Sequence, residues 1–237
     1  MAFSRSEMMA DGPIKDILPK LSKAGVAQWK NTPVLLKSRV ESHVYVSGRE
    51  ELTEEVEVLL ELCELIGKQT QAYTKELPVS RGGRKICYIG LPTAGTALAM
   101  GAAVYNINTP FMMNSCFRIM REVRKGHGAH NFWVNGKPDN GDYVYVTVDN
   151  VITTGTSILE GIERLREDGY AVEDVLHIVV IDRQQGGLES LVARGIKVEA
   201  LFNLLDLVWA FGELNLWPKD RVKAVEIEIE AHKSRDL

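Results

Sequence analysis

The sequence YVYVTVDNVITTGTSILEGIERL, from Tyr143 to Leu165, decides the fold class. Its first seven residues are aromatic, β-branched and apolar apart from the last, which predicts a buried strand that ends at Val148. SILEGIERL follows with apolar residues three and four positions apart, the spacing of a helix packed on one face. Ser157 lies three residues before Glu160, which predicts a capping box at the start of that helix. The short loop TTGTS therefore joins a buried strand to a helix.

The same alternation of strands and helices continues on both sides of this segment. ICYIGLP, from Ile86, and VLHIVVIDR, from Val175, are apolar almost throughout, and each precedes a segment with helical character. A further helix is expected from Thr53, and another over residues 14–25 with an interruption at Pro19. Strands that are apolar on both faces and alternate with helices are typical of an α/β fold with a mainly parallel sheet flanked by helices. In such sheets ligands bind at the carboxyl ends of the strands.

Composition narrows the functional classes. The chain has 237 residues, of which 45% are hydrophobic and 25% are charged, as expected of a soluble globular protein that forms one compact unit. A formal net charge of −4 argues against non-specific binding of nucleic acid. We find no apolar run of the ~18 residues that a membrane helix needs, and no secretory signal. Three cysteines without metal-ligand spacing indicate buried, reduced thiols. We therefore expect a cytoplasmic protein.

The loop TTGTS is suited to binding a phosphate monoester. The first backbone N–H groups of a helix have no partners within the helix and carry a partial positive charge. Gly155 allows the backbone to curl closely around an anion, but the GK[ST] ending of a Walker loop is absent. An ordinary turn with an N-cap is the alternative interpretation. Asp149 and Asn150, just before the loop, are able to hydrogen-bond vicinal hydroxyls such as those of a ribose. The candidate phosphate ligands are Thr153, Thr154, Gly155, Thr156 and Ser157.

A hydrophobic strand, a polar pair and V-I-T-T-G-x-S resemble the phosphoribosyl pyrophosphate (PRPP) motif of type I phosphoribosyltransferases. In that family the loop holds the 5′-phosphate, and the pair before it holds the 2′- and 3′-hydroxyls of the ribose. The usual pair is Asp-Asp or Glu-Asp, whereas this chain has Asp149 and Asn150. The resemblance implies the fold of that family over residues 51–237, with residues 1–50 forming an N-terminal helix and a small hood-like part.

Two further segments resemble the orotate branch of the family. LKSRVESHVYVSGR is similar to F-x-L-K-S-G-x-x-S-x-Y, in which Lys37 matches a lysine that contacts PRPP. Tyr45 and Val46 then occupy positions that line the base pocket. VIDRQQGG is similar to D-R-x-x-G-G, and Arg183 matches the arginine that pairs with the carboxylate of orotate. A planar guanidinium grips a carboxylate through two hydrogen bonds, which fits this role.

A third segment, MREVRKGHGAH, resembles the mobile catalytic loop R-K-x-x-K-x-H-G of that branch. Arg121, Lys125 and His127 match, whereas Glu122 replaces the first lysine. The neighbouring Arg124 is one candidate to restore the lost positive charge. A solvated basic turn is the alternative interpretation. A basic loop flanked by glycine also suits a lid that closes over a polyanion.

The resemblance implies the reaction of orotate with PRPP to give orotidine 5′-monophosphate and pyrophosphate, a step of pyrimidine nucleotide biosynthesis. Mg²⁺ is implied as cofactor, bound mainly by PRPP oxygens and water near Asp149. The loop residues Arg121, Lys125 and His127 would neutralise the departing pyrophosphate, with His127 as the candidate general acid. A homodimer with shared active sites is implied, because in the family the loop reaches the neighbouring subunit.

Two departures from the family pattern leave rival functions open. Asn150 and Glu122 each alter a charge that the family uses in catalysis. A non-catalytic PRPP-binding regulator and a phosphoribosyltransferase for another base are the alternatives. If the second acid stabilises positive charge on the ribose, Asn150 lowers turnover by one or two factors of ten, each about 1.4 kcal/mol. On that hypothesis, Asn150→Asp is the more active enzyme.

Overall fold

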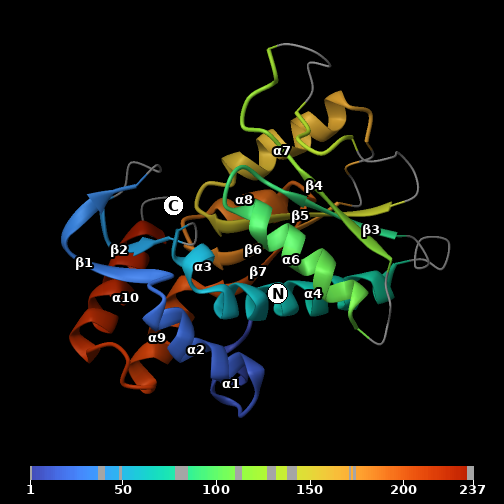
Figure 1. The fold of residues 1–237 in the computed structure, drawn as a ribbon. Helices are drawn as coiled ribbons and strands as arrows, with labels where there is room; N and C mark the ends of the chain where they lie inside the picture. The colour runs from blue at the N-terminus through green and yellow to red at the C-terminus, as the bar shows by residue number, and fades with distance from the viewer. Residues whose placement is uncertain are drawn as a thin grey trace.

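A parallel sheet with helices on both faces carries a small two-stranded hood, as the computed structural model in Figure 1 shows. The structure describes residues 2–36, 41–47, 50–77, 85–109, 114–126, 132–137, 143–170, 172 and 175–233. The sheet has five parallel strands in the order β4-β3-β5-β6-β7, and β1 pairs antiparallel with β2 in the hood. The strands are β1 (Ala27–Leu35), β2 (Glu41–Val46), β3 (Lys85–Gly90), β4 (Ser115–Ile119), β5 (Tyr143–Ile152), β6 (Leu176–Asp182) and β7 (Lys197–Asn203).

Helices cover both faces of the sheet, which confirms the predicted α/β class. On one face α4, α6 and α9 contribute to a core cluster that also includes the hood, and α7 and α8 contribute to a second cluster on the other face. Side chains alternate along β5, so that Val146 and Val148 face the first cluster and Tyr145 faces the second. The helices are α1 (Arg5–Met9), α2 (Pro13–Lys23), α3 (Glu50–Glu54), α4 (Val56–Glu76), α6 (Gly95–Ile107), α7 (Thr156–Glu167), α8 (Gly187–Ala193), α9 (Leu204–Glu213) and α10 (Lys219–Lys233).

The hood, defined as β1 and β2, is packed onto the rest of the molecule. Val44 and Val46 of β2 belong to the same core cluster as α4, α9 and α10. The amide N–H of His43 in β2 donates to Glu228 of α10 at 3.0 Å. The division into residues 1–50 and 51–237 stays a prediction. None of the described helices is long and apolar enough to cross a membrane.

Strand β5 is longer than predicted. It continues beyond Val148 to Ile152 because β6 runs beside it, and Ile152 is paired with Asp182. Asp149 and Asn150 therefore lie within the strand rather than after it, and their backbone is held by the sheet. The expected interruption of the first long helix at Pro19 is also wrong, because α2 runs through this residue.

The predicted capping box is wrong as well. Helix α7 begins at Thr156, and its N-cap is Gly155, which has the left-handed φ of 79° and no side chain to cap with. Ser157 is consequently inside the first turn, and its hydroxyl is available to the adjacent cavity. The expected helix from Thr53 is divided into α3 and α4.

Candidate functional site

The loop between β5 and α7 forms a cradle at the carboxyl edge of the sheet. Helix α8, which connects β6 to β7, holds it in place, because the N–H of Gly187 in α8 donates to the carbonyl of Thr153 at 3.0 Å. A Cβ atom on Gly187 would lie 2.2 Å from that carbonyl oxygen, so only glycine allows this close approach. The positive φ of Gly155 then turns the chain into α7. The backbone of the cradle is therefore fixed from both sides.

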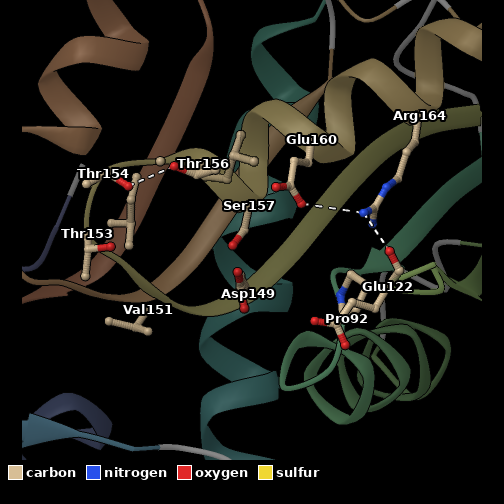
Figure 2. A pocket seen from close by; sticks show the side chains of 13 residues that line it. Pro92, Glu122, Asp149, Val151, Thr153, Thr154, Thr156, Ser157, Glu160 and Arg164 are labelled. Atoms are coloured by element: carbon tan, nitrogen blue, oxygen red, sulfur yellow. Dashed lines mark hydrogen bonds and ion pairs between the residues drawn. The ribbon is translucent and has the colours of Figure 1, made fainter. Parts of the chain in front are cut away.

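A first cavity of about 360 Å³ lies over the cradle, and Figure 2 shows its side chains. The hydroxyls of Thr154 and Thr156 are 2.9 Å apart. Exposed hydroxyls beside the N–H groups of a helix start are suited to an anion, and that they bind one stays a prediction. The cavity is lined by Pro92, Glu122, Asp149, Val151, Ile152, Thr153, Thr154, Gly155, Thr156, Ser157, Ile158, Glu160 and Arg164.

A second cavity of about 540 Å³ lies between the cradle and the hood. It shares Asp149, Thr153 and Ser157 with the first cavity, so the two are neighbouring parts of one site. Its walls are formed by residues at the ends of the sheet strands and by residues of the two hood strands. The lining residues are Lys30, Val34, Leu35, Leu36, Tyr45, Val46, Ser47, Pro92, Ala94, Asp149, Asn150, Val151, Thr153, Ser157 and Arg183.

Arg183 is a buried cation in the wall of the second cavity, with 4% of its surface exposed. Its Nη2 donates to the hydroxyl of Ser42 at 3.0 Å and to the carbonyl of Val44 at 2.9 Å. Burial lowers the pKa of Arg183 to about 10, whereas Glu228 and Tyr45 oppose the shift. Its buried Nε has no hydrogen-bond partner among the described residues. A buried cation with an unsatisfied donor is suited to an anionic ligand.

The two predicted base-pocket residues lie in the same cavity as Arg183. Val46 is 7% exposed and Tyr45 is 42% exposed, and both line the second cavity. The ammonium of Lys30 lies 5.7 Å from the centre of the Tyr45 ring. The structure therefore places Tyr45, Val46 and Arg183 in one cavity. That they bind the base stays a prediction.

Asp149 and Asn150 lie where the two cavities meet. Asp149 is 7% exposed, and its Oδ1 accepts a hydrogen bond from the N–H of Asn150 at 2.8 Å. The Nδ2 of Asn150 donates to the carbonyl of Ser47 at 3.1 Å. Asp149 reaches both cavities, whereas Asn150 reaches only the second. The two neighbouring residues therefore have different surroundings.

The basic loop is described only as far as residue 126. The Nε of Arg121 donates to the carbonyl of Trp133 at 3.3 Å, and neither Arg121 nor Lys125 lines the two cavities. Arg124 forms an ion pair with Glu167, so it does not replace the charge lost at Glu122 in this arrangement. Glu122 itself lines the first cavity. The remaining predicted ligands, Lys37 and His127, lie outside the described residues.

Sequence reasoning missed several residues of the site. Glu160 and Arg164 lie on α7 and line the first cavity. The dashed lines in Figure 2 join the guanidinium of Arg164 to the carboxylate of Glu160 and to the backbone carbonyl of Glu122. Glu160 and Arg164 lie three and seven positions after Ser157, and this spacing places all three residues on one face of the helix. That spacing is a signal that the sequence itself carries. Lys30 of the hood and Ser47, directly after β2, carry no such signal, because only the fold brings them to the cavity.

A cradle at the carboxyl edge of a parallel sheet, next to a second cavity closed by a small hood, defines the type I phosphoribosyltransferase fold. The orotate phosphoribosyltransferase of Aeropyrum pernix is 31% identical over 206 residues, which cover 86% of this chain and 98% of the relative. The orotate phosphoribosyltransferase of Thermosynechococcus vestitus is 33% identical over 155 residues, which cover 60% of this chain and 80% of the relative. The chain therefore belongs to the orotate phosphoribosyltransferase family. It spans 57% of the length of a third relative, from Nostoc sp., at 35% identity.

Solved structures agree with this assignment. The crystal structure of the Aeropyrum pernix enzyme superimposes with a TM-score of 0.60 at 27% identity, covering 85% of this chain and 99% of that one. The UMP synthase of Leishmania donovani has the same fold, with a TM-score of 0.72 at 20% identity over 95% of this chain and 43% of that one. No family model matches the chain.

Proposed function

We propose that the protein transfers a phosphoribosyl group from PRPP to orotate, with release of pyrophosphate. The observation that carries this proposal is the shared wall of the two cavities. Asp149, Thr153 and Ser157 line both, so the phosphate cradle and the buried guanidinium of Arg183 open onto one space. A phosphate monoester at one end and a carboxylate at the other match the two charged ends of orotidine 5′-monophosphate.

Each group of site residues has its own proposed role in the reaction. The cradle would bind the 5′-phosphate through N–H groups and hydroxyls, and Asp149 would accept hydrogen bonds from the ribose hydroxyls. Arg183, with Tyr45 and Val46, would orient orotate so that its nitrogen faces the ribose. Positive charge develops on the ribose as pyrophosphate leaves, and the carboxylate of Asp149 would stabilise it. Arg121, Lys125 and His127 are proposed to neutralise pyrophosphate when the loop closes.

Mg²⁺ is the proposed cofactor. Among the described residues there is no group of three or more His, Cys, Asp or Glu side chains that could hold a metal ion. Asp149 at the junction of the cavities fits an ion that is bound mostly by phosphate oxygens and water. When bound, Mg²⁺ would supply positive charge that stabilises the leaving pyrophosphate.

A non-catalytic PRPP-binding protein is the second candidate. Glu122 lines the first cavity, where the family has a lysine, and the described basic side chains of the loop lie outside both cavities. A carboxylate at this place weakens the attraction for a leaving polyanion. A protein that only binds PRPP would tolerate that loss.

One assay separates these functions. Protein, Mg²⁺, PRPP and orotate are mixed, and the loss of orotate absorbance is followed, with uracil and adenine as alternative bases. We expect turnover with orotate, and at least a hundredfold loss of kcat in Asp149→Asn, about 2.7 kcal/mol. If no base is turned over but calorimetry shows that PRPP binds, the protein is the non-catalytic PRPP-binding protein. If uracil or adenine is turned over and orotate is not, the protein is a phosphoribosyltransferase for that other base.

We further propose that the protein is a cytoplasmic homodimer that associates through α4 and α6. These helices lie side by side and expose a row of apolar side chains, each about half accessible. An apolar pocket of about 360 Å³ between α3, α4 and α6 adds to this face. Exposed apolar patches of this kind mark association surfaces. The described cysteines are free thiols, in keeping with a reducing compartment. The exposed row consists of Val56, Leu60, Met100, Val104 and Ile107.

Light scattering after size exclusion tests the dimer. We expect the wild-type protein to elute at twice its mass of 26.4 kDa. Leu60→Glu should shift it toward the monomer, because a carboxylate would be buried in an apolar interface. The matched control is Val192→Glu, since Val192 of α8 is also half exposed but lies away from α4 and α6. A monomeric wild type, or equal effects of both variants, would contradict this interface.

A further inference from the structure

Asn150 is the residue at which this chain departs from the acidic pair of its family, and the structure shows what its amide does. Its Nδ2 donates to the carbonyl of Ser47 at 3.1 Å, across 103 residues of sequence. Only a donor can face a carbonyl oxygen at this distance. An ionised carboxylate has acceptors alone, so an aspartate at position 150 would lose this bond and place two oxygens against each other.

Ser47 is itself fixed, so its carbonyl is a defined target. Its N–H donates to the carbonyl of Val26 at 2.9 Å, and its hydroxyl donates to Glu51 of α3. Glu51 also accepts a hydrogen bond from Gln28 of β1 at 2.9 Å. The end of β2 is thereby tied to β1 and α3, and Asn150 adds the link to the sheet.

This link lies in the wall of the second cavity. Tyr45 and Val46 of the hood and Ser47, directly after β2, line it from one side, and Asn150 lines it from the sheet. The backbone of Asn150 cannot yield easily, because Asp149 and Val151 on either side are paired with β6. The hydrogen bond therefore fixes the distance between the hood and the sheet edge at the place where Tyr45 and Val46 meet the cavity.

We propose that Asn150 is a positioning residue that fastens the hood to the sheet and so shapes the pocket for the planar base. This chain has an amide at position 150 in place of the family's carboxylate because the hydrogen bond to Ser47 needs a donor. Its Oδ1 accepts no hydrogen bond from the described residues, and it remains able to accept one from a ribose hydroxyl. This inference rests on the proposed function, and it reverses the expectation that Asn150→Asp is the more active enzyme.

Kinetics of Asn150→Asp and Asn150→Ala provide the first test. We expect both variants to raise KM for orotate about tenfold or more, and to raise KM for PRPP less, because the hood contributes to the base pocket. The control Asn31→Asp adds the same charge at an exposed position of β1 and should behave like wild type. A higher kcat in Asn150→Asp with an unchanged KM for orotate would overturn the proposal.

The pH dependence gives a readout that a purely structural role would not change. A carboxyl at position 150 would face the carbonyl of Ser47 and lie next to Asp149, and both favour its protonated form, which is again a donor. The defect of Asn150→Asp should therefore shrink between pH 8 and pH 5 relative to wild type. Asn150→Ala cannot recover in this way and serves as the matched control. Parallel pH profiles for the two variants would contradict a hydrogen bond to Ser47.

Hydrogen exchange separates this inference from the proposed function, because it requires no turnover. Amide exchange over residues 41–47 should be faster in Asn150→Asp and Asn150→Ala than in wild type, while exchange in β6 should stay unchanged. A wild-type protein that turns over no orotate would refute the function but not the link. Equal protection of the hood in all three proteins would refute the link whatever the activity.

Discussion

Arg164 of α7 donates from Nη2 to the carbonyl of Glu122 at 2.9 Å, and this bond joins the cradle helix to the basic loop. Its Nη1 donates to the carbonyl of Arg121 at 3.0 Å, and its guanidinium lies 4.9 Å from the centre of the Phe132 ring. The N–H of Arg121 in turn donates to the carbonyl of Phe132 at 2.6 Å, which closes the stem of the loop. One side chain therefore holds both strands of the stem against the helix that begins at the phosphate cradle.

Replacing Arg164 by lysine should lower kcat/KM about tenfold, or by about 1.4 kcal/mol. A lysine keeps the charge but has one ammonium, so it cannot reach both carbonyls in the fixed geometry of a guanidinium. Steady-state kinetics with varied PRPP measure the effect. Arg166→Lys is the matched control, because Arg166 is exposed on the same helix. Equal kinetics for the two variants would show that Arg164 has no part in placing the loop.

Local sequence patterns predicted the features that short segments determine. The apolar runs around Val146 and Ile178 predicted a sheet buried on both faces, and the small hydroxyl residues around Gly155 predicted the cradle. Arg183 was predicted by its motif alone, and the structure places it in the same cavity as Tyr45. Each of these features depends on residues that lie close together in the sequence or on the known order of motifs.

The features that were missed depend on partners far away in the sequence. Strand β5 passes Val148 because β6 supplies hydrogen-bond partners beside it. Gly155 became the N-cap because the cradle needs its left-handed φ, so the pairing of Ser157 with Glu160 does not form. The bond from Asn150 to Ser47 joins two segments that only the folded hood brings together. Periodicity carries no information about such contacts.

Arg183 should control the affinity for orotate and leave the affinity for PRPP nearly unchanged. Arg183→Gln removes the cation but keeps a donor for Ser42 or Val44. We expect KM for orotate to rise about a hundredfold, because a charged hydrogen-bonded pair of about 2.7 kcal/mol is lost. Arg194→Gln, at an exposed position after α8, is the control. A rise in KM for PRPP of the same size would show that Arg183 serves the whole site rather than the base.

Gly187 should be required for phosphate binding although it lies outside the loop. A methyl group there would meet the backbone carbonyl of Thr153 at 2.2 Å, and neither backbone can move aside without shifting the cradle. We expect Gly187→Ala to weaken PRPP binding at least tenfold in calorimetry, about 1.4 kcal/mol. Ser190→Ala, within α8 and away from the cradle, should bind PRPP like wild type. Unchanged binding by Gly187→Ala would mean that the cradle adjusts freely.

His177 of β6 makes the stability of the protein depend on pH. It is fully buried, its Nδ1 lies 2.5 Å from the hydroxyl oxygen of Thr147, and its Nε2 has no partner among the described residues. Burial lowers the pKa of His177 from 6.5 to about 3. Between these values the unfolded chain binds a proton that the folded chain does not bind. The stabilising contribution is therefore complete above pH 6.5 and declines as the pH falls toward 3.

Urea denaturation at a series of pH values from 7.5 to 5 measures this effect. The free energy of unfolding of the wild type should fall below pH 6.5 with a slope that approaches about 1.4 kcal/mol per pH unit. In the double variant Thr147→Val/His177→Leu the slope should be smaller by this amount, because the titrating group is gone and no buried polar partner is left alone. An unchanged slope would mean that His177 takes up its proton in the folded protein, which requires water or an anion to reach its Nε2 inside the sheet.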